Sequence, residues 1–193
     1  MIATERLLLR RWKPEDFAPF CAMNADEEVM RHFPSTLNPE QTKAGLNRVE
    51  THFDRHGWGL FAAEHEGQFI GYIGLFHVPF EAHFTPAVEI GWRLARSHWN
   101  RGLATEGARA CLDFGFSKLD LKEIVAFTPP ANLASRRVME KLGMLHDVQG
   151  DFEHPRVAPG HALCRHVLYR IGNYFPPTEN ASSTLPGPPP VNA

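Results

Sequence analysis

The chain has 193 residues, of which 43% are hydrophobic, and it carries a formal net charge of -2. That length supports one domain with a sizeable core, and the near-neutral charge gives no reason to expect a nucleic-acid or membrane partner. Three widely spaced cysteines exclude a disulfide framework, and the N-terminus lacks the apolar run of a signal peptide or membrane span, so we expect a cytoplasmic protein.

The first part of the chain predicts one strand followed by two helices. Residues 6–12 alternate as a strand does, and Pro14 with the acids after it favours a helix start. A further helical turn is expected over residues 27–33. The second helix opens on Asn38-Pro39-Glu40-Gln41, which is typical of a capping box, and Gly57 marks its end.

Two strands and a connection come next. Residues 58–64 and 69–78 flank the turn Glu66-Gly67 and predict an antiparallel hairpin. Residues 79–86 form an irregular connection. The hairpin therefore occupies the middle of the chain in front of its most informative stretch.

That stretch is a strand, a glycine turn and a helix. Residues 88–95 alternate between apolar and polar, and helical spacing begins at about Gly102. The unpaired N–H groups of a helix start, together with small Ala104 and the charges of Arg96 and Arg101, suit an anion such as phosphate. An ordinary strand-to-helix turn is the alternative.

The remaining elements complete one domain and a tail. Residues 122–128 predict a strand parallel to the preceding one, and a helix capped at Asn132 ends at Gly143. Strands follow over 144–148 and 162–171. Residues 173–193, rich in proline and serine, read as a flexible tail beyond a domain of residues 1–172. The expected fold is a mixed, mostly antiparallel α/β sheet of six to seven strands with helices on both faces.

The sequence EIGWRLARSHWNRGLATEGA resembles the acyl-CoA-binding motif of the GNAT acetyltransferases. In that motif a glutamine or arginine stands three residues before a glycine, and a glycine or alanine follows two residues after it. Gly102 and Ala104 fit the pattern, whereas Trp99 replaces the first residue, as in the branch that acetylates the N-terminal alanine of ribosomal proteins. The resemblance implies the GNAT fold and a turn whose backbone amides hold the CoA pyrophosphate.

A second match, Asn132 to Met144, resembles the Asn-x-x-Ser stretch that lies along the pantetheine arm of CoA. With the first match, it implies acetyl-CoA as the acyl donor. The implied cofactor-binding residues are Trp92, Arg93, Leu94, Trp99, Asn100, Arg101, Gly102, Leu103, Ala104, Thr105, Asn132 and Ser135.

The resemblance also implies direct transfer of an acetyl group to a primary amine. Glu89 matches the glutamate of the branch and is a candidate base, or a group that attracts the amine; a solvent-facing or salt-bridged strand residue is the alternative. Where many family members have a tyrosine that protonates the leaving thiolate, this chain has Met139. Ser135 or a water would then supply the proton, unless the thiolate leaves unaided. A backbone N–H between Trp92 and Leu94 is the expected oxyanion donor, provided that this strand splays from its neighbour.

Four residues near the C-terminal strand, His154, His161, Cys164 and His166, have spacings that match no common ligand pattern, so we expect no metal. In a GNAT fold, His154 and His161 would flank a loop beside the acceptor. We therefore expect an acetyl-CoA-dependent N-acetyltransferase whose acceptor is a protein N-terminus or a small amine, with a homodimer compatible with the sequence. A non-catalytic acyl-CoA-binding module is the alternative, because Met139 has no proton to give.

Overall fold

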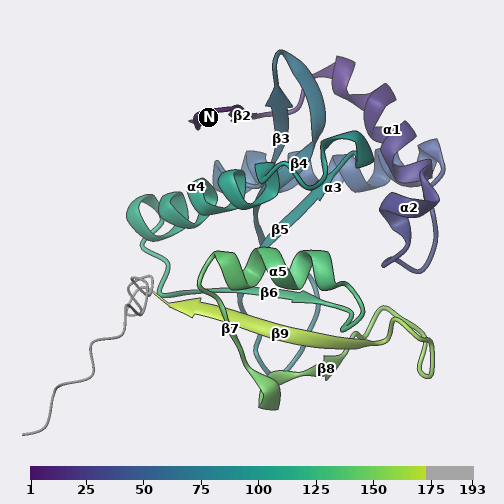
Figure 1. The fold of residues 1–193 in the computed structure, drawn as a ribbon, viewed down its shortest axis with the longest axis vertical. Coiled ribbons are helices and arrows are strands. Elements are labelled where there is room, and N and C mark those ends of the chain that lie inside the picture. Colours follow the sequence, from purple (N-terminus) through teal and green to yellow (C-terminus); the bar gives the residue numbers. More distant parts are fainter. Residues whose placement is uncertain (173–193) are drawn as a thin grey trace, which may run out of the picture.

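The structure is a computed structural model that describes residues 1–172 (Figure 1). The expectation for residues 173–193 lies outside the described residues. Nine strands form the sheet in the order β1-β2-β3-β4-β5-β6-β9-β7, with β8 pairing beside this path with β9. The strands are β1 Ile2–Ala3, β2 Leu7–Arg10, β3 Leu60–His65, β4 Gln68–His77, β5 Val88–Leu94, β6 Glu123–Thr128, β7 Leu145–His146, β8 Phe152–Glu153 and β9 Arg165–Gly172.

Five α-helices accompany the sheet in the described part of the chain. They are α1 Phe17–Ala25, α2 Glu27–Met30, α3 Pro39–His56, α4 Leu103–Lys118 and α5 Leu133–Lys141. None of them combines the length and hydropathy that crossing a membrane requires. All strand pairs are antiparallel except β5 with β6, so the predicted mixed and mostly antiparallel sheet is confirmed.

The two ends of helix α3 are determined by the residues next to them in the sequence. The side chain of Asn38 accepts a hydrogen bond from the backbone N–H of Gln41 at 2.8 Å, and the Gln41 side chain accepts one from the N–H of Asn38 at 2.9 Å. At the other end Gly57 takes a φ of 77°, which glycine adopts readily. The predicted bounds of this helix are therefore confirmed.

The hairpin of β3 and β4 turns at Glu66 and Gly67, whose φ angles are 52° and 76°. Two successive positive φ angles fit the tight turn that matches the twist of the strands. The predicted hairpin is confirmed.

Neighbouring residues of β4 show that helices cover both faces of the sheet. Tyr72 lies edge-on to Phe20 of α1, with ring centroids 6.2 Å apart. Ile73 points to the other face, where a side chain on Gly107 of α4 would overlap it. Figure 1 shows α4 and α5 together on one side of the sheet, with α1 to α3 on the other.

The short strands differ from the sequence-based expectation. The strands β1 and β8 have two residues each, too few for an alternating pattern. The strand predicted over residues 144–148 is reduced to β7, because the Asp147 side chain accepts a hydrogen bond from the N–H of Gly150 at 3.0 Å and starts a 3₁₀ turn. These differences lie at the edges of the sheet and leave its centre as expected.

Candidate active site

The parallel strands β5 and β6 separate in the middle of the sheet. Their register contains a single pair, Glu89 with Val125, although β5 continues to Leu94. Beyond that pair the side of β5 that faced β6 has no strand partner in the described residues. A cavity of about 610 Å³ occupies this region and is lined by β5, the start of α4, α5 and residues around β8 and β9.

The turn before α4 forms one wall of the cavity. Gly102 has a φ of 78°, and the first helical hydrogen bond runs from the N–H of Glu106 to the carbonyl oxygen of Gly102 at 3.0 Å. The N–H groups of Leu103, Ala104 and Thr105 precede that bond and therefore have no acceptor within the helix. All three residues line the cavity. With the positive end of the helix dipole behind them, these amides suit a phosphate group.

Trp99 fixes this turn to the end of β5. Its indole Nε1 donates a hydrogen bond to the carbonyl oxygen of Leu94 at 2.7 Å. Its ring packs against two groups of buried hydrophobic residues, one that includes Leu103 and one that includes Val29. The side chain that departs from the family motif thus supports the turn, while the backbone amides of Leu103, Ala104 and Thr105 stay free for a ligand. Asn100, with a φ of 57°, and Gly102 complete the bend.

Arg6 adds positive charge beside the turn, which sequence reasoning missed. Its Nε donates to Oε2 of Glu106 at 2.7 Å, and its Nη1 donates to the carbonyl oxygen of Arg101 at 2.9 Å. A Cβ on Gly102 would lie 3.5 Å from Nη2 of Arg6. The ion pair with Glu106 therefore holds this guanidinium next to the amides of α4, although almost a hundred residues separate Arg6 from the turn.

Arg101 does not line the cavity, unlike the other predicted cofactor-binding residues. Its Nη2 lies 3.2 Å from Nε2 of His65, which is also outside the lining. Arg96 is exposed in the 3₁₀ turn after β5 and is likewise absent from the lining. Arg6 lies beside Gly102 but is likewise outside the lining, and its charge is paired with that of Glu106.

Glu89 lies in the cavity wall where β5 and β6 part. It is half-buried, and its Oε1 is 3.9 Å from the position that a Cβ on Gly91 would take. Within residues 1–172 no group donates a hydrogen bond to its carboxyl, so the salt-bridged alternative does not hold. Burial raises the pKa of Glu89 to about 8. The cavity thus contains a carboxyl group that can take up or release a proton near neutral pH.

The start of α5 faces the same cavity. Asn132 Oδ1 accepts from the N–H of Ser135 at 3.2 Å, and Asn132 Nδ2 donates to Oγ1 of Thr128 at 2.9 Å. The hydroxyl of Ser135 has no hydrogen-bond partner among the described residues, although it lines the cavity. Met139 lies in the same wall and is 2% exposed. A serine hydroxyl is therefore available where the methionine offers no proton.

Arg93 occupies the part of the cavity that adjoins α2. Its Nη1 donates to Oδ1 of Asn24 at 2.7 Å, and its guanidinium carbon lies 3.9 Å from the ring centroid of Phe33. Its Nε is buried and has no hydrogen-bond partner in the described part of the chain. The side chain thus points toward α1 and α2, away from the turn of Gly102, and only its backbone is placed for the cofactor role expected from the sequence.

The four residues singled out near the C-terminal strand separate in the fold. His154 and His166 line the cavity with ring centroids 4.9 Å apart, and burial, followed by the charges of His166 and Arg156, lowers the pKa of His154 to about 4. His161 is exposed outside the lining, and Cys164 is buried outside it. Of the two histidines expected beside an acceptor, the structure brings only His154 to the cavity.

Other lining residues were not apparent from the sequence. They come from α2 and the loop after it, from β4, from α5 and from the loop between β8 and β9, and no motif singled them out individually. These residues include Glu28, Arg31, His32, Tyr72, Arg137, Lys141 and Arg156.

The chain is similar to several known proteins. Residues 6–145 match the family model described as "Acetyltransferase (GNAT) domain". The chain is 36% identical over 146 residues to the uncharacterized protein YkkB of Bacillus subtilis, covering 74% of this chain and 84% of that one. It is 33% identical over 144 residues to the uncharacterized N-acetyltransferase YnaD of Bacillus subtilis, covering 74% and 81%. A crystal structure of a GNAT-family acetyltransferase from Bacillus anthracis superposes with a TM-score of 0.71 at 30% identity, covering 89% and 97%.

Proposed function

The chain belongs to the GNAT acetyltransferase family, and from that premise we propose that it transfers an acetyl group from acetyl-CoA to a primary amine by direct attack. One observation carries the proposal. The opening between β5 and β6 exposes the unpaired amides of α4 and the unpartnered carboxyl of Glu89 to the same cavity. An anion site and a titratable group in one cleft are what a coenzyme-dependent acyl transfer needs.

The donor side fits the charge of a coenzyme diphosphate. The amides of Leu103 to Thr105 and the guanidinium of Arg6 would hold the phosphates, since Gly102 leaves no Cβ between them. Arg137 and Lys141 of α5 line the same cavity and can offset further phosphate charge. Asn132 and Ser135 would lie along the pantetheine arm, as the family resemblance implies.

The chemical step requires a neutral amine. A free α-amino group has a pKa of about 8, so Glu89, with a pKa of about 8, can take its proton directly or through water at the same pH. Acetyl-CoA, when bound, supplies the thioester carbonyl. The amine nitrogen forms the new C–N bond, a backbone N–H of Trp92 to Leu94 stabilises the oxyanion, and the C–S bond then breaks. Ser135 or a water passes the remaining extra proton of the amine nitrogen to the departing thiolate, which leaves a neutral amide and a thiol.

The acceptor is proposed to be a protein N-terminus or a small amine that carries few positive charges. On the side of the cavity away from the α4 turn, the lining includes Arg31, Arg93 and Arg156, with Glu28 as the carboxylate from α2. A polyamine would meet more repulsion than attraction here. Acetyl-CoA is a cytoplasmic metabolite, and we therefore assign the protein to the cytoplasm, where its free cysteines would stay reduced.

The direct test is thiol release from acetyl-CoA in the presence of an amine panel. The panel contains peptides beginning with alanine or serine, free amino acids, simple alkyl amines and a polyamine. Turnover with a peptide or a small amine, confirmed by the mass of the acetylated product, is the expected result. Tight binding of CoA with no turnover across the panel would contradict the proposal and favour the second candidate, a non-catalytic acyl-CoA-binding module, for which buried Met139 is the specific observation.

A further inference from the structure

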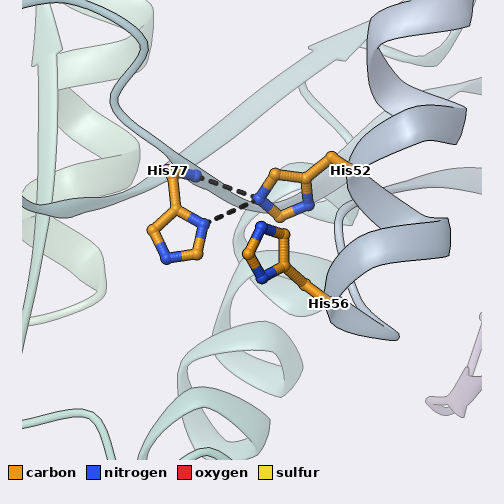
Figure 2. Close-up of side chains that lie close together, drawn as sticks. All are labelled: His52, His56 and His77. Atoms are coloured by element: carbon orange, nitrogen blue, oxygen red, sulfur yellow. Dashed lines mark hydrogen bonds between the residues drawn. The ribbon is translucent and has the colours of Figure 1, made fainter.

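Three histidines converge at the end of the sheet away from the α4 turn. His52 lies on α3, His56 follows one helical turn later, and His77 is the last residue of β4. Figure 2 shows the three rings facing one another, and one ligand nitrogen from each lies within 4.8 Å of the others. Across residues 1–172 this is the one group of three or more histidine, cysteine or acidic side chains with ligand atoms so close. None of the three lines the cavity.

His52 is oriented as a metal ligand would be. Its Nδ1 lies 2.8 Å from the carbonyl oxygen of Trp58, and because a carbonyl only accepts, Nδ1 carries the proton. Nε2 therefore carries the lone pair, which faces His77 and accepts a hydrogen bond from the backbone N–H of His77 at 3.3 Å (Figure 2). The ring is 8% exposed and stacks on Phe76 with centroids 4.2 Å apart. Histidines that bind metals commonly donate their second ring N–H to a backbone carbonyl in this way, which fixes the ring.

His77 and His56 lie close enough to His52 for the three side chains to bind one cation. Nδ1 of His77 lies 2.9 Å from Nε2 of His52, so one proton is shared where two nitrogens point at each other (Figure 2). The ring of His56 lies 4.5 Å from that of His52 and 4.6 Å from that of His77, measured between centroids. His56 and His77 are exposed, which leaves a path from solvent and room for a water ligand. A metal ion would take the place of the shared proton.

The electrostatic setting also suits a cation. His56 is the last residue of α3, an 18-residue helix whose C-terminal carbonyl groups carry partial negative charge. Arg55 is the charged neighbour that opposes binding; it is exposed, and water screens its charge.

We propose that His52, His56 and His77 bind a divalent transition-metal ion, with Zn²⁺ as the favoured ion and water in the remaining position. Three imidazoles are a ligand set that Zn²⁺ accepts in tetrahedral geometry, and two histidines four residues apart on a helix present both rings on one face. The ion would join the end of α3 to the end of β4, and the folded state would gain stability as free zinc rises above the dissociation constant.

The test uses the full chain with any affinity tag removed, after dialysis against a chelator. Equilibrium dialysis and titration calorimetry with ZnCl₂ measure stoichiometry and affinity, and thermal unfolding with and without zinc measures stabilisation. Trp58 reports locally, because its ring lies 4.8 Å from His52, 5.8 Å from His56 and 4.9 Å from His77, so bound Cu²⁺ should quench its fluorescence. Trp58→Phe should remove that signal.

His56→Ala and the matched control His161→Ala decide the outcome. Both positions are exposed, so both variants should fold, which circular dichroism checks. We expect one zinc per chain in the wild type and in His161→Ala, and at least a tenfold loss of affinity in His56→Ala, with the zinc-dependent rise in Tm lost. No stoichiometric binding, or equal binding by His56→Ala and His161→Ala, would overturn the proposal and leave the cluster as packed aromatic rings.

Discussion

The indole Nε1 of Trp99 donates to the carbonyl oxygen of Leu94 at 2.7 Å and so ties the end of β5 to the turn that precedes α4. By this point β5 has left β6, so the carbonyl has no strand partner on that side. The bond thus satisfies a backbone group that the opening of the sheet leaves free. It also sets the distance between the expected oxyanion donors on β5 and the amides of α4.

Replacement of Trp99 by phenylalanine should weaken binding of acetyl-CoA. An aromatic ring remains, but the Leu94 carbonyl loses its hydrogen-bond donor, which costs about 1–3 kcal/mol. Each 1.4 kcal/mol of this cost that weakens the bound state raises KM about tenfold. Trp12→Phe is a matched control, because Trp12 Nε1 donates to the carbonyl oxygen of Leu60 at 2.8 Å outside the cavity. Steady-state kinetics measure the change in KM for each variant, and Tm measures any general loss of stability. Equal changes in KM would refute a special role for Trp99.

A carboxylate at Gly102 should abolish CoA binding. Gly102→Glu would bring negative charge to the amides of α4 and beside Arg6, where phosphate is expected. Gly143→Glu is the control, because Gly143 has a φ of 81° and a Cβ there would have no atom within 4 Å, so this variant shares the backbone strain alone. Both variants should lose roughly 1 kcal/mol of stability. Calorimetry with CoA should show binding by the Gly143 variant only.

Much of the fold could be predicted because its signals are local. The capping box of α3, the turn of Glu66 and Gly67, and the helix that begins after Gly102 each depend on a few neighbouring residues, and all are confirmed. The two-residue strands β1 and β8 form only by pairing with another strand, so their own sequences contain no pattern that predicts a strand.

The candidate site was predictable where it lies on one continuous stretch of chain. Residues from Glu89 to Thr105 were identified together, whereas Arg6 reaches the turn only through the packing of the N-terminus on α4. The side chain of Arg101 lies against His65 and outside the lining, because the sequence does not say where a long side chain in a turn will lie. Likewise the i, i+4 spacing of His52 and His56 is visible in the sequence, but His77 joins them only through the register of β4 and the packing of α3.

Glu89→Gln should depress turnover while CoA affinity is unchanged. Loss of a general base typically costs about 10²-fold or more in rate. Because a base acts in its deprotonated form and burial raises the pKa of Glu89 to about 8, wild-type kcat/KM should rise with pH and level off above that value. The kcat/KM of the variant should not show this rise with pH. Unchanged turnover near neutral pH would remove Glu89 from the mechanism.

The same substitution should change stability with a definite sign. Since the folded pKa of Glu89 lies above its ordinary value of 4.5, the folded state loses stability as pH rises from about 4.5 to about 8. Glu89→Gln should therefore raise Tm at about pH 8.5 and have little effect at about pH 4. Glu64→Gln should behave oppositely, because a hydrogen bond from Arg10 at 2.6 Å lowers the pKa of Glu64. Its destabilisation should be present near neutral pH and fade in acid. Parallel trends in the two variants would contradict this account.

Replacement of Arg93 by lysine should affect the acceptor amine rather than acetyl-CoA. A lysine cannot lie flat over Phe33 and also donate to Asn24 as the planar guanidinium does, and the guanidinium lines the cavity with Nη2 lacking a hydrogen-bond partner among residues 1–172. A carbonyl or carboxylate of the acceptor can supply that partner. KM for a peptide beginning with alanine should rise about tenfold, by loss of a charged hydrogen bond, while KM for an alkyl amine without a carbonyl changes little. Arg170→Lys controls for general effects, because Arg170 pairs with Asp147 and Glu123 outside the cavity. An equal rise in KM for acetyl-CoA and for both amines would show that Arg93 supports the fold of the cleft and does not contact the acceptor.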